Sequence, residues 1–136
     1  MAQVLEPPPH GSPSEASWQW RALPGTIVSH ADGGSGCVLS DGHFAVFGGV
    51  DANGTISSLC GALTLDIDIA SWDALPPMHE PRRPLACAAV GGCVIVAGGV
   101  GSTTAEVYEE GIGQWGRLPC SLPPHIELYC MGSTLM

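Results

Sequence analysis

The sequence predicts an all-β protein built from repeated four-stranded antiparallel sheets, and three observations support this. Glycine (19 residues) and proline (12) are abundant while charged residues make up 12%, which disfavours helices and suits short strands joined by tight turns. The stretch "FAVFGGV" at 44–50 returns as "VIVAGGV" at 94–100, so a hydrophobic strand twice runs into a glycine pair. A Trp-x-x-Leu-Pro motif occurs three times, at 20–24, 72–76 and 115–119.

These anchors define a repeat of 43 to 52 residues, a length typical of one four-stranded unit of a repeat protein. For the first unit (25–76) we expect strands at about 36–39, 44–47, 62–66 and 71–75. For the second unit (77–119) we expect them at about 85–90, 93–97, 105–108 and 114–118. A lone fourth strand at 18–23 precedes the units, and a further unit begins at 120–136 with a strand near 126–131.

Turn signals stand where this scheme needs hairpins. "SDG" at 40–42 and the glycine pair at 91–92 separate the first two strands of each unit. Asn53-Gly54 predicts a type I′ turn in the loop between the second and third strands of the first unit. Residues 1–17 are rich in proline, serine and glutamate, which predicts a flexible tail that buries too little apolar surface to order itself.

The recurring residues have physical reasons. The doublets Gly48-Gly49 and Gly98-Gly99 end a strand where the chain turns sharply beside other backbone, so a Cβ would clash or force a strained positive φ. Trp20, Trp72 and Trp115 lie on last strands, where a large ring can fill the space between neighbouring sheets.

Aligning the two units also superposes smaller residues. Alignment on the doublets places Cys37 on Cys87, and counting from the tryptophans places Cys130 on the same strand position. We therefore expect these three cysteines to be small core residues at equivalent positions. Tyr108 and Leu65 each lie seven residues before a motif tryptophan, so Leu65 is expected at the place of the tyrosine.

Charge excludes several kinds of partner. The net charge is −9, lysine is absent and arginine occurs four times, so the clustered positive charge that nucleic acids and anionic membranes require is missing. Apolar runs such as "VIVA" at 94–97 are far too short to span a membrane, and no signal peptide is visible. We expect a cytoplasmic or nuclear protein with reduced thiols.

Patterns that carry chemistry are weak. Gly99-x-Gly101 follows a strand like a dinucleotide fingerprint, but Thr104 replaces the third glycine and no helix-length segment follows. Five histidines and six cysteines form neither a C-x-x-C nor an H-x-x-x-H motif. No nucleophile elbow is found. We expect no cofactor, no metal and no enzyme activity.

The stretch "HEPRRPLACAAVGGCVIVAGGVGSTTAEVYEEGIGQWGRLP" at 79–119 resembles a kelch repeat. It has an arginine (Arg82) after the preceding fourth strand, hydrophobic residues leading into the Gly98-Gly99 doublet, the pair Tyr108-Glu109, and Trp115 six residues later. The first unit is more degenerate, with Leu65 for the tyrosine and Asp32 at the aligned place of Arg82.

This resemblance implies an incomplete β-propeller made of kelch-type blades over residues 18–136. It implies a protein–protein interaction module whose loops bind other proteins, in the manner of substrate-recruiting or scaffolding subunits of ubiquitin ligases. Arg82 would be a framework residue, and Arg83 is the freer candidate for a contact. The candidate binding residues lie in the loops after the doublets and beside Arg82: Asp51, Asn53, Thr55, Ser57, Arg83, Ser102, Thr103 and Thr104.

Two alternatives stay open at this point. Some kelch-like propellers are copper radical oxidases, which need a Tyr–Cys cross-link and further tyrosine and histidine ligands, whereas this chain has two tyrosines, Tyr108 and Tyr129. A closed ring needs at least four blades, and the chain carries two complete units and parts of two more. We therefore expect a fragment or truncated gene product, completed by missing blades or by other copies that assemble into a ring.

Overall fold

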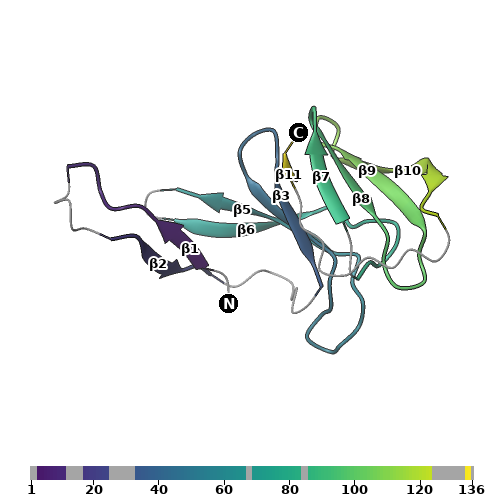
Figure 1. Ribbon diagram of the computed structural model, residues 1–136, viewed down its shortest axis with the longest axis horizontal. Coiled ribbons are helices and arrows are strands. Elements are labelled where there is room, and N and C mark those ends of the chain that lie inside the picture. The colour runs from purple at the N-terminus through teal and green to yellow at the C-terminus, as the bar shows by residue number, and fades with distance from the viewer. Residues whose placement is uncertain are drawn as a thin grey trace.

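The computed structural model describes residues 3–11, 17–24, 33–66, 69–83, 86–123 and 134–135, and its regular elements there are all strands (Figure 1). This confirms the all-β class. The strands form a two-stranded N-terminal sheet, a four-stranded central sheet and a five-stranded C-terminal sheet. In chain order they are β1 (Gln3–Glu6), β2 (Gln19–Ala22), β3 (Ser35–Val38), β4 (Phe44–Phe47), β5 (Cys60–Leu65), β6 (Ala70–Leu75), β7 (Ala86–Val90), β8 (Cys93–Ala97), β9 (Thr104–Glu109), β10 (Gln114–Ser121) and β11 (Thr134–Leu135).

The strands expected for the first unit form the central sheet, and those expected for the second unit belong to the C-terminal sheet. The central sheet has the order β3-β4-β5-β6, and the C-terminal sheet has β10-β9-β8-β7 with β11 added in parallel beside β7. Every other neighbouring pair is antiparallel, so each unit is a meander of four consecutive strands. The strand expected near 126–131 lies outside the described residues.

The glycine doublets end β4 and β8 in equivalent places. Gly48, Gly49, Gly98 and Gly99 all have positive φ, at 61°, 92°, 85° and 123°. A Cβ on Gly99 would also lie 3.2 Å from the Arg82 Cα. Both expected reasons for glycine are therefore present at this position, a left-handed backbone and a close approach to another segment.

Of the predicted turns, the one at Gly91-Gly92 is confirmed, whereas the one at Asn53-Gly54 lies one residue earlier than expected. Gly91 and Gly92, with φ of 55° and 81°, form the two-residue connection between β7 and β8. In the β4–β5 loop the Gly54 N–H donates to the Asp51 carbonyl over 3.1 Å, which makes Ala52 and Asn53 the central residues. The type I′ prediction for Asn53-Gly54 is wrong by one residue: Gly54 follows the turn at φ 81°, as in a three-residue hairpin loop.

Part of the stretch expected to be a flexible tail is a strand. Gln3–Glu6 form β1, which pairs antiparallel with β2, and the Glu6 carboxylate accepts a 2.7 Å hydrogen bond from Arg21 Nε. Val4 packs beside a buried cluster of Leu23, Leu63 and Trp72. The tail prediction missed this because a single inward apolar residue and a strand edge that needs a partner leave little trace in composition. Residues 12–16 lie outside the described part.

The main core lies between the central and C-terminal sheets. Its buried members come from both sheets and from the connector between them: Cys37, Leu39, Ala45, Phe47, Cys60, Ala62, Met78, Cys87, Ala89, Val94, Val96 and Tyr108. The Trp115 ring packs against this core, with its centroid 5.9 Å from the Phe47 ring and 5.2 Å from the Tyr108 ring. The tryptophan therefore fills the space between two sheets, as expected.

Cys37 and Cys87 are both core residues, as expected, but they do not occupy equivalent strand positions. Cys37 and Cys87 are both buried in this core. However, Val38 pairs with Phe44 across the first hairpin whereas Ala89 pairs with Val94, so five residues separate one pair and four the other. The extra residue turns Cys37 to the opposite face of its own sheet, and the two thiols meet from facing sheets instead of repeating one position. Cys130 lies outside the described residues.

The equivalence of Leu65 and Tyr108 is also wrong. Tyr108 pairs with Trp115, whereas the residue that pairs with Trp72 is Leu63, and Leu65 is 46% exposed at the end of β5. The β5–β6 and β9–β10 connections are equally long, at 66–69 and 110–113, but Trp72 is the third residue of its strand and Trp115 the second, which shifts the count from the tryptophan. Asp32 lies outside the described residues.

Candidate functional site

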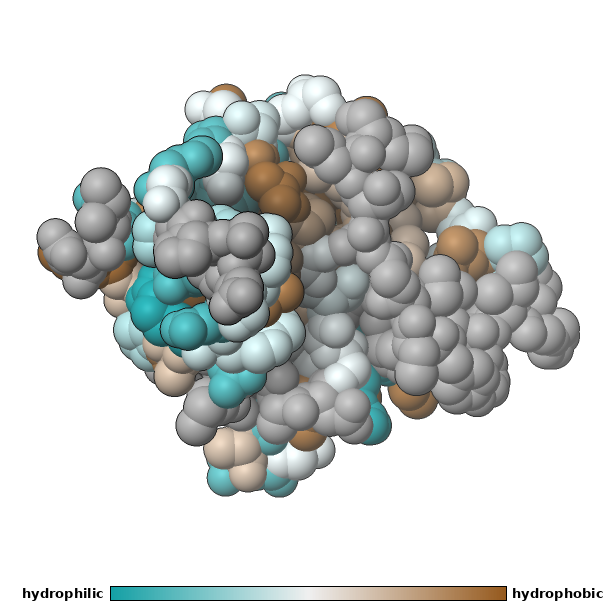
Figure 2. Space-filling view, turned by 60° about the vertical axis from the view of Figure 1, so that its left-hand side comes forward, coloured by the Kyte–Doolittle hydropathy of each residue, from teal (hydrophilic) through white to brown (hydrophobic). Residues whose placement is uncertain are grey.

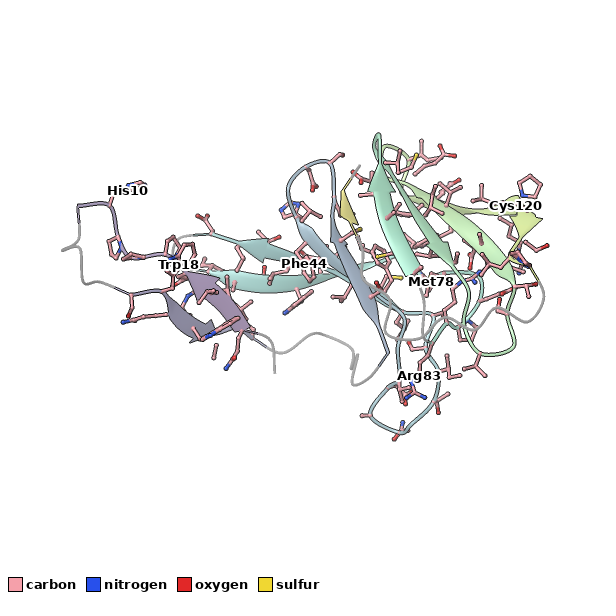
Figure 3. All side chains as sticks on the ribbon, in the orientation of Figure 1. His10, Trp18, Phe44, Met78, Arg83 and Cys120 are labelled. Carbon is pink, nitrogen blue, oxygen red and sulfur yellow. The ribbon has the colours of Figure 1, made fainter. Side chains whose placement is uncertain are left out.

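Three segments meet at one end of the two large sheets: the β4–β5 loop, the β8–β9 loop and the connector 76–83 between β6 and β7 (Figure 3, near Arg83). Backbone hydrogen bonds join them. Gly49 N donates to the Arg82 carbonyl over 3.0 Å, Arg82 N donates to the Ser57 carbonyl over 3.2 Å, and Val100 N donates to the Arg83 carbonyl over 2.8 Å. The connector is therefore bound to the loops of both sheets, and we call this part of the molecule the loop end.

The buried Arg82 side chain organises the loop end. Its Nη1 donates to the carbonyls of Gly98 and Thr104 over 2.8 and 2.9 Å, and its Nη2 donates to Thr104 Oγ1 over 2.9 Å. Its Nε and Nη2 both donate to Glu106 Oε2, over 3.2 and 2.9 Å. A fully buried guanidinium is tolerable only when its donors are paired in this way.

Glu106 completes a buried ion pair. Its side chain is 1% exposed and lies on β9, at the inward position two residues before Tyr108. Oε1 accepts hydrogen bonds from the His79 backbone N–H (2.7 Å) and pairs with His79 Nδ1 (2.8 Å). Burial alone raises the pKa of Glu106, but the hydrogen bonds from His79 and Arg82 outweigh it, so this pKa lies below its ordinary value.

A second carboxylate, Glu80, extends the network toward solvent. Its Oε2 accepts hydrogen bonds from Thr104 Oγ1 (2.6 Å) and Ser102 Oγ (2.9 Å), and its Oε1 lies 3.2 Å from Arg117 Nη1. These hydroxyl bonds, followed by the charges of Arg82 and Arg117, hold the pKa of Glu80 below its ordinary value.

The expected binding residues all lie at the loop end, where six of them form two groups and two stand apart. Ser57, Ser102 and Thr104 belong to the network around Arg82 and serve as its supports. Asp51, Asn53 and Thr55 form a self-contained turn, in which Asp51 Oδ1 accepts the N–H groups of the other two over 2.8 and 2.9 Å. Thr103 is exposed, and Arg83 is half-buried with its side-chain stem against Gly33.

The sequence reading did not place His79, Glu106 or Arg117 at the site. A signal for Glu106 existed, because in "TAEVYE" it falls on the same strand face as Tyr108. A carboxylate at an inward strand position needs a buried cation as its partner, and the same sequence carries two adjacent arginines in "PRRP" at 81–84. Together they indicate a buried ion pair.

An exposed apolar residue also lies at the loop end. Val100 follows the second doublet and is 71% exposed, although its N–H is fixed by the Arg83 carbonyl. Its counterpart in the first unit, Val50, is less exposed: it is half-buried and forms a β-bridge with Ile56. An exposed apolar side chain on a hydrogen-bonded backbone is a feature of contact surfaces more than of free loops.

Tyr108, Cys37 and Cys60, whose side chains could react, are buried and serve as packing residues. Tyr108 is buried under Trp115, and burial raises its pKa. Burial raises the pKa of Cys60 to about 12, and a hydrogen bond to Cys87, followed by burial, raises the pKa of Cys37, so both thiols are protonated near neutral pH. Within the described residues no three histidine, cysteine or carboxylate side chains gather as metal ligands would.

Neither the known protein families nor the curated proteins include a match to this sequence. Within the described part of the chain, no helix has the length and apolar character needed to cross a bilayer.

Proposed function

We propose that this chain is a protein–protein interaction module made of kelch-type propeller blades, and that the loop end is its contact surface. One observation carries the proposal. Loops from two different sheets are held in fixed positions by a connector that bonds to both, and they project the exposed Val100 beside small polar residues. Binding residues commonly lie on loops that a rigid scaffold positions.

The chemistry of the loop end favours a protein partner. The groups that could react are engaged in the network around Arg82, which fixes the loops. The exposed side chains of the loops include short polar ones, such as Thr55 and Thr103, and two apolar ones, Val100 and Leu59, which is 40% exposed. An apolar anchor within a polar rim is the arrangement of protein interfaces. A scaffolding or substrate-recruiting role in a larger complex of the ubiquitin-ligase type is the role that the resemblance favours.

The test compares two exposed apolar residues at opposite ends of the same sheet. Val100→Asp changes the loop end, and Ile112→Asp changes the β9–β10 turn, where the isoleucine is 62% exposed. Both variants and the wild type are used as baits in a quantitative proximity-labelling experiment in cells. We expect Val100→Asp to deplete a defined set of neighbours by about tenfold or more, while Ile112→Asp retains them.

Equal retention by both variants, or equal loss from both, contradicts the proposal. Thermal unfolding of each purified variant checks that neither substitution acts by unfolding the chain. A small-molecule turnover that depends on His79 or Glu106 would replace the proposal with an enzyme.

A further inference from the structure

Both interfaces between neighbouring sheets are closed by the same hydrogen bond. Trp72 Nε1 donates to the Pro24 carbonyl over 3.0 Å, which links the central sheet to the N-terminal sheet. Trp115 Nε1 donates to the Pro76 carbonyl over 2.7 Å, which links the C-terminal sheet to the central sheet. In each case the tryptophan of one Trp-x-x-Leu-Pro motif contacts the proline of the preceding motif.

The leucines of the motif repeat in the same way. Leu23 lies in the cluster with Trp72, and Leu75 packs against the core on which Trp115 also packs. Each motif therefore presents its tryptophan to the preceding sheet, and its leucine and proline carbonyl to the following sheet. The side chains alternate along the strand, which places the tryptophan and the leucine on opposite faces.

Among the described residues, the tryptophan of the first motif has no such contact with a preceding sheet. Among the same residues, the leucine and proline of the third motif have none with a following sheet. Trp20 is 66% exposed and pairs with Leu5, which is 42% exposed, on the face of the N-terminal sheet opposite Val4. In Figure 2 this end of the molecule is turned toward the viewer, and hydrophobic residues appear in separate places among hydrophilic ones.

The outward face of the C-terminal sheet offers the complementary half. Leu118 lies on the face opposite Trp115, and the strands beside it contribute Val107, Ile95 and Val90 to that face through their register. Ile95 and Val90 are 37% and 38% exposed. Pro119 is exposed, as Pro24 and Pro76 are.

We infer that copies of this chain associate head to tail, with Trp20 of one copy on the Leu118–Pro119 face of a second copy. Trp20 Nε1 donates to the Pro119 carbonyl, and Leu5 packs on the apolar face around Ile95. The contact repeats the geometry of the two interfaces inside the chain. It joins two different surfaces, so it builds a ring if the rotation closes and an open chain if it does not. This inference goes beyond the proposed function and does not depend on it.

The first experiment measures the mass of the full chain by sedimentation velocity over a range of concentrations. We expect the wild type to form dimers or larger species, and Trp20→Ala to raise the dissociation constant by about tenfold or more. Trp20→Phe keeps a ring but loses the donor, so it weakens association by a smaller factor. Ile69→Ala is the matched control, because this residue is also 66% exposed but lies beside the β5–β6 turn. A wild type that stays monomeric at all concentrations overturns the inference.

The second experiment tests the polarity of the contact by complementation. Ile95→Glu destroys the C-terminal face and leaves Trp20 intact, while Trp20→Ala does the reverse. We expect each variant alone to be monomeric and an equimolar mixture to form a one-to-one dimer. A mixture that stays monomeric, or an Ile95→Glu variant that still associates like the wild type, overturns the inference. Val90→Glu serves in place of Ile95→Glu if circular dichroism shows that the latter is unfolded.

Discussion

The interface between the N-terminal and central sheets and the interface between the central and C-terminal sheets share their tryptophan-to-proline hydrogen bond and differ in what surrounds it. At the first, the described residues bury a cluster of three side chains, Leu23, Leu63 and Trp72. At the second they bury twelve, and the Arg82–Glu106 ion pair lies beside them. The ion pair of the N-terminal sheet, Arg21 with Glu6, is 43% and 44% exposed.

This difference shows how one repeated motif serves interfaces of unequal strength. The tryptophan and proline fix how two sheets are placed, and the stability of the contact depends on the apolar surface and on whether polar groups are paired out of water. The loop end is built on the stronger interface, where rigid loops are easiest to maintain.

The largest expected effect comes from removing the buried arginine. Arg82→Met leaves Glu106 buried without its partner, so we expect a loss of about 3–5 kcal/mol in the free energy of unfolding. Arg21→Met removes the exposed pair of the N-terminal sheet and should cost less than about 1 kcal/mol. Urea unfolding followed by tryptophan fluorescence measures both. Comparable losses in the two variants would break the distinction between the interfaces.

The buried pair should also make stability depend on pH. The pKa values of Glu106 and Glu80 lie below their ordinary values in the folded protein. Their contribution is therefore complete above the ordinary glutamate pKa of about 4.3 and is lost as the pH falls from there through the lower folded values. Thermal unfolding between pH 7 and pH 3 should show this decline.

Glu106→Gln identifies the source of the decline. We expect this variant to be less stable than the wild type at pH 7 and to lose less stability on acidification. A wild-type slope that persists unchanged in the variant would assign the acid sensitivity to other carboxylates.

A smaller effect is expected from the glycines of the β8–β9 loop. Gly99 and Gly101 both have positive φ, at 123° and 73°, but only at Gly99 would a Cβ meet the Arg82 backbone, at 3.2 Å. Gly99→Ala should cost about 1–3 kcal/mol, more than Gly101→Ala. Equal costs, measured by urea unfolding, would mean that φ alone requires glycine and that the close approach matters little.

The smallest effect should be the same at both interfaces. Trp72→Phe and Trp115→Phe each keep a ring and remove one donor to a proline carbonyl, so each should cost about 0.5–1.5 kcal/mol. Thermal unfolding measures both. A loss confined to one variant would show that the shared hydrogen bond does not contribute equally.

The sequence was a good guide to the elements and a poorer guide to the register between them. Strands, glycine doublets and motif tryptophans could be predicted because each depends on local propensity and on a recurring backbone requirement. The equivalence of Cys37 with Cys87 failed because the two hairpins differ in length. That of Leu65 with Tyr108 failed because the two tryptophans stand at different positions along their strands. The loops of the candidate site could be located, and the strand pattern marks Glu106 as an inward residue, but its pairing with Arg82 across 24 positions depends on tertiary structure.

The connector has a consequence for dissecting the chain. Met78 is buried in the core that the neighbouring sheets share, and the Pro76 carbonyl receives the indole of Trp115. The boundary between residues 76 and 77, which the repeat marks as the edge of a unit, thus cuts through a packed junction. A fragment excised there would lose the acceptor of its own tryptophan. The smallest piece that folds by itself must therefore contain residues from two neighbouring repeats.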